Sequence, residues 1–193
     1  FISRPSWCLN MMTAKKLNFG NIMGHVTNVT NLSSLASWTA DQFDPTLTWE
    51  DIAWIKDRWK GKLILKGIMD SEDAMLAVKA GADAIIISNH GGRQLDGAPS
   101  TISVLPEIVD AVNSKVEVHF DGGVRSGQDV LKALALGADC IHIGRPYIYG
   151  LGAKGQEGVE IAIEIIKKEL DLTMAMCGET NISNVGLHNL HHN

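Results

Sequence analysis

Residues 84–96 read Ala-Ile-Ile-Ile-Ser-Asn-His-Gly-Gly-Arg-Gln-Leu-Asp. The first four are apolar and mostly β-branched, and a polar, glycine-rich run follows without a break. A short apolar run of this kind is typical of a parallel strand with helices covering both faces of the sheet. We therefore predict a buried strand at residues 84–87 that ends in a functional loop.

The loop after this strand carries an imidazole and a guanidinium. A histidine can take a proton near neutral pH, which makes His90 a candidate base. The planar fork of Arg93 suits a carboxylate. Gly91 and Gly92 between them let a ligand approach the backbone closely. The pattern predicts a base beside an anion-binding group, although a capping histidine and a surface arginine would look the same.

Composition points to an ordinary globular domain, with 193 residues of which 45% are hydrophobic and 20% charged. The net charge of −5 and the absence of a long basic run argue against a nucleic-acid partner. Cys8, Cys140 and Cys177 lie far apart without metal-ligand spacing, so we expect reduced thiols and no metal site. No apolar run reaches the roughly 18 to 20 residues that span a bilayer, which predicts a soluble or peripheral protein.

The chain shows no clean period over residues 1–47 and regular β/α alternation from residue 48 onward. Residues 71–88 and 127–144 repeat one plan, in which Gly-Ala-Asp ends a helix and a strand follows. We expect strands at 62–68, 84–87, 116–120 and 140–143. Helices are expected at 48–61, 72–80 (capped by Ser71), 100–112 and 156–170, with a shorter one after Thr180. Such alternation gives a parallel sheet, and both a doubly wound sheet and a closed barrel fit it.

Polar residues cluster at the predicted carboxyl ends of the strands, which in a barrel converge on the mouth where active sites lie. They are Lys66, Ser88, His90, Arg93, Asp121, Arg125 and Arg145.

Two glycine loops with arginines follow the last two strands. One contains Asp121, Gly122, Gly123 and Arg125, and the other contains Gly144 and Arg145. Backbone N–H groups of such loops next to a helix start form a phosphate cradle, an arrangement common after the last two strands of a barrel. Two ordinary turns with exposed arginines are the alternative.

Three polar residues lie within the predicted strands themselves. Lys66 is a cation in an apolar strand, where an unpaired charge is costly. A phosphate, a carboxylate or a flavin ring would compensate it, and a structural ion pair with Asp121 is the alternative. His119 and His142 alternate with apolar neighbours and are expected to pack or to form hydrogen bonds.

Taken together, the motifs closely resemble those of the FMN-dependent α-hydroxy-acid dehydrogenases and oxidases. They are Leu65-Lys66-Gly67, residues 88–96, residues 121–127 and Gly144-Arg-Pro146. Arg4-Pro-Ser-Trp-Cys8 and residues 37–45 are most similar to the bacterial flavin L-lactate dehydrogenases within that family.

The resemblance implies a role for each site residue. His90 would take a proton from an L-2-hydroxy acid, with L-lactate the expected substrate, as two electrons pass to FMN. Arg93 would bind the substrate carboxylate, and Lys66 would stabilise negative charge on the reduced flavin. Ser88 would touch the flavin, and the two glycine loops, with Asp121, Gly122, Gly123, Arg125, Gly144 and Arg145, would hold ribityl and phosphate.

The resemblance also implies a TIM (β/α)₈ barrel of which this chain, opening with Phe1, covers about strands five to eight. Residues 48–193 would be the carboxyl-terminal half of the FMN domain. Residues 1–47 would be the mobile loop before it, and Trp7, Met11, Met12, Lys15 and Lys16 suit contact with a membrane surface.

The expected partners follow from the same resemblance. They are a small 2-hydroxy acid, an electron acceptor that is a quinone, a cytochrome or oxygen, and either further copies of the chain or the missing half. We expect a cytoplasmic protein, peripheral on the inner face of the cell membrane. The alternative is a catalytically silent half-barrel that binds phosphate or FMN or self-associates, since an open half-barrel exposes two strand edges.

Overall fold

The computed structural model describes residues 4–14, 22 and 32–191. The chain divides into two compact units, Phe1–Thr48 and Trp49–Asn193. Within the described residues, no helix is both long and apolar enough to cross a bilayer. The second unit carries the sheet and every predicted site residue.

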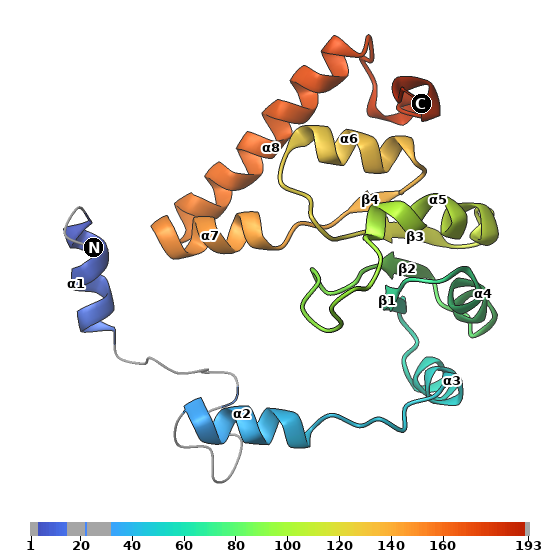
Figure 1. Ribbon diagram of the computed structural model, residues 1–193, viewed down its shortest axis with the longest axis horizontal. Helices are drawn as coiled ribbons and strands as arrows, with labels where there is room; N and C mark the ends of the chain where they lie inside the picture. Colours follow the sequence, from blue (N-terminus) through green and yellow to red (C-terminus); the bar gives the residue numbers. More distant parts are fainter. Residues whose placement is uncertain (1–3, 15–21, 23–31, 192–193) are drawn as a thin grey trace. The chain divides into compact units, whose positions relative to one another are not determined.

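The first unit contains two helices where the sequence predicted no regular structure. They are α1 (Pro5–Thr13) and α2 (Leu32–Asp41) (Figure 1). α1 begins with a proline, whose fixed φ suits the first helical position. No residue of α1 is buried, so no apolar stripe marks this helix in the sequence. Lys15 and Lys16 lie outside the described residues.

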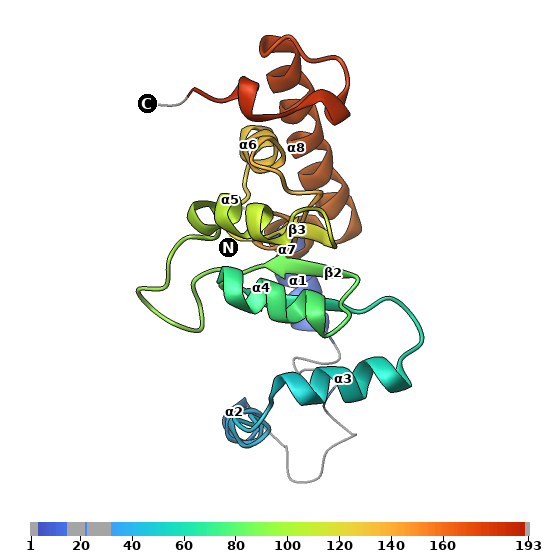
Figure 2. The same cartoon turned by 90° about the vertical axis from the view of Figure 1, so that its right-hand side faces the viewer.

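The second unit is a parallel sheet with helices between successive strands (Figures 1 and 2). Its strands are β1 (Ile64–Ile68), β2 (Ala84–Ile87), β3 (Glu117–Phe120) and β4 (Cys140–Ile141). Its helices are α3 (Trp49–Arg58), α4 (Ser71–Lys79), α5 (Thr101–Val112), α6 (Gly127–Ala135), α7 (Arg145–Lys154) and α8 (Gln156–Met176), followed by the 3₁₀ turns η1 (Ile182–Asn184) and η2 (Leu187–Asn189).

The strand order among the described residues favours one of the two architectures that the sequence left open. The strands lie in the order β1-β2-β3-β4, each hydrogen-bonded to the next in the chain. A doubly wound sheet reverses its order at a switch point, whereas consecutive strands of a barrel do not. The order therefore supports part of a barrel.

The two faces of this sheet differ in chemistry because successive side chains of a strand point to opposite sides. One face packs against the helices and is dry: Ile85, Ile87, Val118 and Phe120 are at most 3% exposed. The helices contribute Leu105, Ile108, Val112 and Ala133 to the same core. The opposite face carries Lys66, Ser88, Glu117, His119, Asp121, Cys140 and His142.

A bulge at Gly67 turns Ile68 to the apolar face, while Lys66 before it stays on the polar face. The register pairs Lys66 with Ile86 and Ile68 with Ile87, so Gly67 is the extra residue. Its φ of +104° is available to glycine at little cost. As a result Ile68 joins the apolar core at 7% exposure while the Lys66 side chain stays 45% exposed.

The two Gly-Ala-Asp repeats form the same contact in the sheet. Asp83 accepts a hydrogen bond from the backbone N–H of Leu63 at 2.9 Å, and Asp139 accepts one from Val118 at 2.7 Å. The backbone N–H of each aspartate donates back to the carbonyl of the same partner at 2.8 Å. Each aspartate therefore ties the start of its own strand to the neighbouring strand.

Two local features differ from the sequence prediction. The cap of α4 is Asp70, whose side chain accepts from Glu72 N at 2.7 Å, and Ser71 is the first helical residue. Ser71 instead donates its hydroxyl to Glu107 at 2.8 Å. The first helix of this unit ends at Arg58, before the predicted Gly61.

Helix α7 was not predicted, because its proline and glycines lower helix propensity. It packs against α8 at a point where glycines face each other. A Cβ on Gly150 would lie 2.3 Å from the Gly158 carbonyl oxygen, and one on Gly158 would lie 1.9 Å from that of Gly150. Only glycines permit this approach, so tertiary packing defines α7.

We predict that Gly150→Ala lowers the free energy of unfolding by about 1–3 kcal/mol, because the added methyl group forces α7 and α8 apart. Gly152→Ala in the same helix is the matched control. A Cβ there meets no atom within 4 Å, so it is expected to stabilise the protein by about 0.5–1 kcal/mol. Urea unfolding measures both, and equal effects of the two substitutions would contradict the packing argument.

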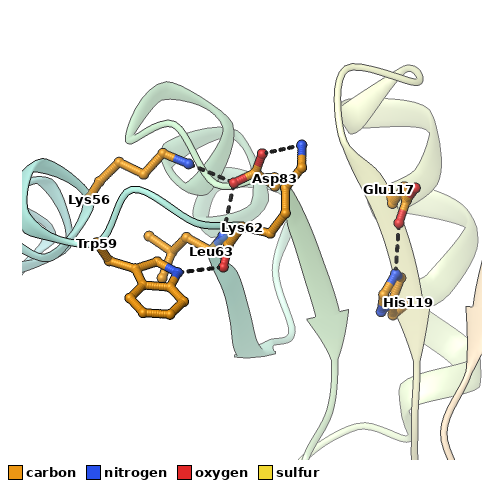
Figure 3. Close-up of polar contacts among 7 residues, drawn as sticks. All are labelled: Lys56, Trp59, Lys62, Leu63, Asp83, Glu117 and His119. Atoms are coloured by element: carbon orange, nitrogen blue, oxygen red, sulfur yellow. Dashed lines mark hydrogen bonds and ion pairs between the residues drawn. The ribbon is translucent and has the colours of Figure 1, made fainter.

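Asp83 also holds two lysines, as Figure 3 shows. Hydrogen bonds from Lys56 at 2.6 Å, Lys62 at 2.8 Å and the Leu63 N–H at 2.9 Å hold the pKa of Asp83 well below its ordinary value of 3.8. A carboxyl group with a lowered pKa stabilises the fold above the unfolded-state pKa. That stabilisation disappears as the pH falls through the lowered value.

We therefore expect Asp83→Asn to be less stable than the parent chain at neutral pH. Below about pH 4 the difference should shrink, because the parent chain alone loses this contribution. Urea unfolding across this pH range measures it, with the exposed Asp110→Asn as control. Curves for the parent chain and Asp83→Asn that stay parallel down to acid pH would contradict the assignment.

Candidate active site

A cavity of about 600 Å³ lies at the carboxyl ends of β3 and β4. The residues of both predicted phosphate loops line it together with Arg93. They are Asp121, Gly122, Gly123, Arg125, Gly144 and Arg145. The structure thus brings together two loops that are separate in sequence.

The loop after β3 requires glycine for two different reasons. Gly122 has a φ of +111°, and a Cβ there would lie 2.5 Å from the Thr101 hydroxyl oxygen. Gly123 has a φ of +79°, and a Cβ there would meet nothing within 4 Å. Gly122 therefore serves the turn, whereas Gly123 leaves open backbone that a ligand can approach.

At the amino-terminal end of α6, the Asp129 carboxylate occupies the place that a bound anion would take. Ser126 and Asp129 form a capping box, and Asp129 accepts hydrogen bonds from the backbone N–H groups of Arg125 at 2.9 Å and Ser126 at 3.0 Å. In the first turn itself, the backbone N–H groups of Gly127 and Asp129 donate to Glu169 at 3.0 Å and to Ser126 Oγ at 3.2 Å, so a phosphate gains little from this helix end.

The amino-terminal end of α7, unlike that of α6, has no capping side chain. Its cap residue is Gly144, which has no side chain to accept from the first amides, and a Cβ there would meet nothing within 4 Å. Helix amides without a capping side chain, next to an arginine, favour an anion. Arg145 donates to the Gly91 carbonyl at 2.8 Å, which ties this end to the loop after β2.

Lys66, Ser88 and Asp121 form one hydrogen-bonded chain across the ends of three strands. Lys66 Nζ lies 2.9 Å from Asp121 Oδ2 and donates to Ser88 Oγ at 2.6 Å, and Ser88 donates to Asp121 Oδ1 at 2.6 Å. The structure therefore shows the ion pair between Lys66 and Asp121 that the sequence left open as an alternative. The lysine side chain is still 45% exposed, so a ligand can reach the cation.

His90 and Arg93 occupy one loop but line different cavities. Arg93 lines the phosphate-loop cavity, and His90 lines a second one of about 540 Å³ that also contacts Ser88. The residues from His90 to Gly92 all have positive φ, of 57°, 68° and 71°. This left-handed run turns the chain between the two side chains and directs them to different cavities.

One cluster below this site was not predicted. His119 Nδ1 lies 3.1 Å from His142 Nε2, and their rings are 5.2 Å apart at an angle of 37°. Burial, and to a lesser degree the neighbouring His119, lowers the pKa of His142, which favours its neutral form. The sequence prediction of hydrogen-bonding histidines is confirmed. That they bond to each other, beside Cys140, follows from strand register and has no local sequence signal.

The residues present fit a phosphate-bearing flavin. The cavity offers three guanidinium groups, open glycine backbone and a helix end without a side-chain cap, all of which suit a phosphate. A lysine at the carboxyl end of β1 offers positive charge on the same face of the sheet.

Comparison with known proteins gives an independent result. A family model described as FMN-dependent dehydrogenase matches residues 1–192. An L-lactate dehydrogenase of Vibrio cholerae is 44% identical over 183 residues, which cover 94% of this chain and 48% of that protein. One from Pseudomonas syringae is 44% identical over 185 residues, covering 95% of this chain and 49% of its own length.

Solved structures similar to this chain point to the same family. The monotopic membrane protein (S)-mandelate dehydrogenase superposes with a TM-score of 0.88 at 35% identity, covering all of this chain and 50% of the other. A mandelate oxidase has a TM-score of 0.75 at 46% identity, covering 81% of this chain and 45% of the other. The predicted fold class, part of a TIM (β/α)₈ barrel, is confirmed. The chain spans about half the length of these relatives, and it belongs to the FMN-dependent dehydrogenase family.

Proposed function

We propose that this chain is the FMN- and substrate-binding part of an L-2-hydroxy-acid dehydrogenase, with L-lactate the expected substrate. The observation that carries the proposal is the joining of both glycine loops and the uncapped end of α7 around one cavity. The names of the relatives, L-lactate dehydrogenase and (S)-mandelate dehydrogenase, support this substrate class.

The phosphate end of the site would hold FMN by charge and backbone donors. Arg125 and Arg145 offer guanidinium groups, and Gly123 and Gly144 leave room for close approach. Because the capping box of α6 already uses its amides, the α7 end is the better phosphate site.

Lys66 would supply charge where the reaction needs it. FMN, when bound, accepts two electrons from the substrate and carries negative charge once reduced. Lys66 stands at the carboxyl end of β1, fixed by Ser88 and Asp121 and still reachable. A cation held in advance stabilises developing negative charge without reorganisation.

His90 and Arg93 would act on the substrate itself. Arg93 would bind the carboxylate through two hydrogen bonds. A ring nitrogen of His90 would take the hydroxyl proton, while the hydrogen on the carbon leaves with the electron pair. In this structure the His90 and Arg93 side chains line different cavities. The conformational freedom of Gly91 and Gly92 would let the loop bring both side chains to one substrate.

The surroundings of the site suggest its partners. β1 and β4 are the edge strands of the described sheet, and unpaired edges favour a further copy or the remaining part of the barrel. On α1, Leu9 and Met12 are 61% and 85% exposed, which suits contact with a lipid surface. We propose a cytoplasmic protein with peripheral membrane contact, and a quinone, cytochrome or oxygen as electron acceptor.

The test is the anaerobic bleaching of flavin absorbance when L-lactate is added to the FMN-loaded chain. We expect L-lactate to bleach the flavin and D-lactate not to. His90→Gln should slow bleaching by about 10²- to 10⁴-fold, because it removes a general base. Arg93→Ala should raise the lactate concentration needed for half-maximal rate. Arg58→Ala, on α3 over Trp54, is the matched control and should change neither.

A second candidate function is binding without catalysis, and the separation of His90 and Arg93 into two cavities favours it. In that case the chain would bind FMN, and the flavin would stay oxidised in the presence of L-lactate. Bleaching that persists at full rate in His90→Gln would instead overturn the role given to this histidine.

A further inference from the structure

The polar face of the sheet carries a second cluster besides the Lys66–Ser88–Asp121 chain. It consists of His119 on β3, Cys140 on β4 and His142 just after β4. His119 stands opposite Cys140 in the strand register, and His142 follows two residues later on the same face. One ligand atom from each of the three lies within 4.8 Å of the other two.

The Glu117 carboxylate fixes the orientation of the His119 ring. Its Nε2 lies 3.2 Å from Glu117 Oε2, while its Nδ1 points to His142 Nε2 at 3.1 Å. A carboxylate on one ring nitrogen fixes the tautomer, so the other nitrogen presents its lone pair. This carboxylate–histidine arrangement is the usual support behind a metal-bound histidine.

The donor set is chemically selective. Two imidazoles and a thiol suit zinc and similar borderline ions, and they suit Mg²⁺ or Ca²⁺ poorly because those ions prefer oxygen. Tetrahedral zinc with Zn–N bonds of about 2.0–2.1 Å places two nitrogens roughly 3.3 Å apart. The two histidine nitrogens lie 3.1 Å apart, which is close to that separation.

We propose that His119, Cys140 and His142 form a binding site for a divalent ion of the zinc class, with Glu117 orienting His119. His119 is 8% exposed, and Cys140 and His142 are half-buried, so the site is sheltered. His142 also lines the phosphate-loop cavity, which leaves the fourth position open to water on that side. The three ligands are not among the residues assigned to the flavin phosphate, although His142 borders the same cavity, and the site does not depend on the proposed oxidation.

A hydrogen bond between the two histidines describes this pair without a metal, and two neighbouring groups point to more than that bond. A histidine–histidine hydrogen bond needs no thiol within reach and no carboxylate behind one ring. Here both are present on the same face. His188 and His191, by contrast, lie near the carboxyl-terminal end, and His188 pairs with Glu179 at 2.8 Å.

The probe is Co²⁺, titrated into the purified, untagged, metal-free chain and followed by absorbance. We expect one Co²⁺ per chain, a thiolate-to-cobalt charge-transfer band, and displacement by one equivalent of Zn²⁺. Cys140→Ser should remove the charge-transfer band while the chain stays folded by circular dichroism. Glu117→Gln should keep the band but weaken the affinity about 10- to 100-fold, as loss of a supporting carboxylate does.

Two controls separate this site from other ligands. Cys177→Ser changes an exposed cysteine outside the cluster and His188→Gln changes a tail histidine, so both should bind Co²⁺ as the parent chain does. The proposal is overturned if the parent chain shows no charge-transfer band. It is also overturned if the band survives Cys140→Ser, or if His188→Gln abolishes binding.

Discussion

The register of the parallel strands is the constraint on which both polar sites depend. Asp83 and Asp139, at equivalent places in the repeat, each accept a backbone N–H from the neighbouring strand and donate one back. A slip of one residue would turn every side chain to the opposite face. With the register fixed, residues far apart in sequence emerge side by side on one face, and the apolar set remains against the helices.

That polar face has two layers. At the carboxyl ends of the strands, Lys66 and Asp121 form an ion pair beside the phosphate loops. One step down, His119 and Cys140 stand opposite each other. The bulge at Gly67 turns Ile68 away from this face, and the glycine contact between α7 and α8 positions the helix whose amino-terminal end lines the cavity. Backbone features away from the site therefore position the groups that form it.

Much of this could be predicted from sequence, because the signals are local. Apolar runs located the strands, and the Gly/Arg loops identified the phosphate residues that line one cavity. The features that were missed are not local. Helix α7 forms through its contact with α8 although its own glycines disfavour it, and the His119–Cys140–His142 cluster exists only through strand register. The cap of α4 was misplaced by one residue, because Asp70 and Ser71 are both good caps and only backbone geometry separates them.

The central claim is that this half of the barrel holds the phosphate of FMN, and a comparison of FMN with riboflavin tests it most directly. The two ligands differ only in the phosphate. The account predicts that the chain binds FMN about 10- to 100-fold more tightly than riboflavin, as measured by the quenching of flavin fluorescence. The reason is that charge-assisted hydrogen bonds from arginine are each worth about 1.5–3 kcal/mol. Arg125→Ala should reduce that difference, whereas Arg58→Ala should preserve it. Equal affinity of the chain for FMN and riboflavin would contradict the account.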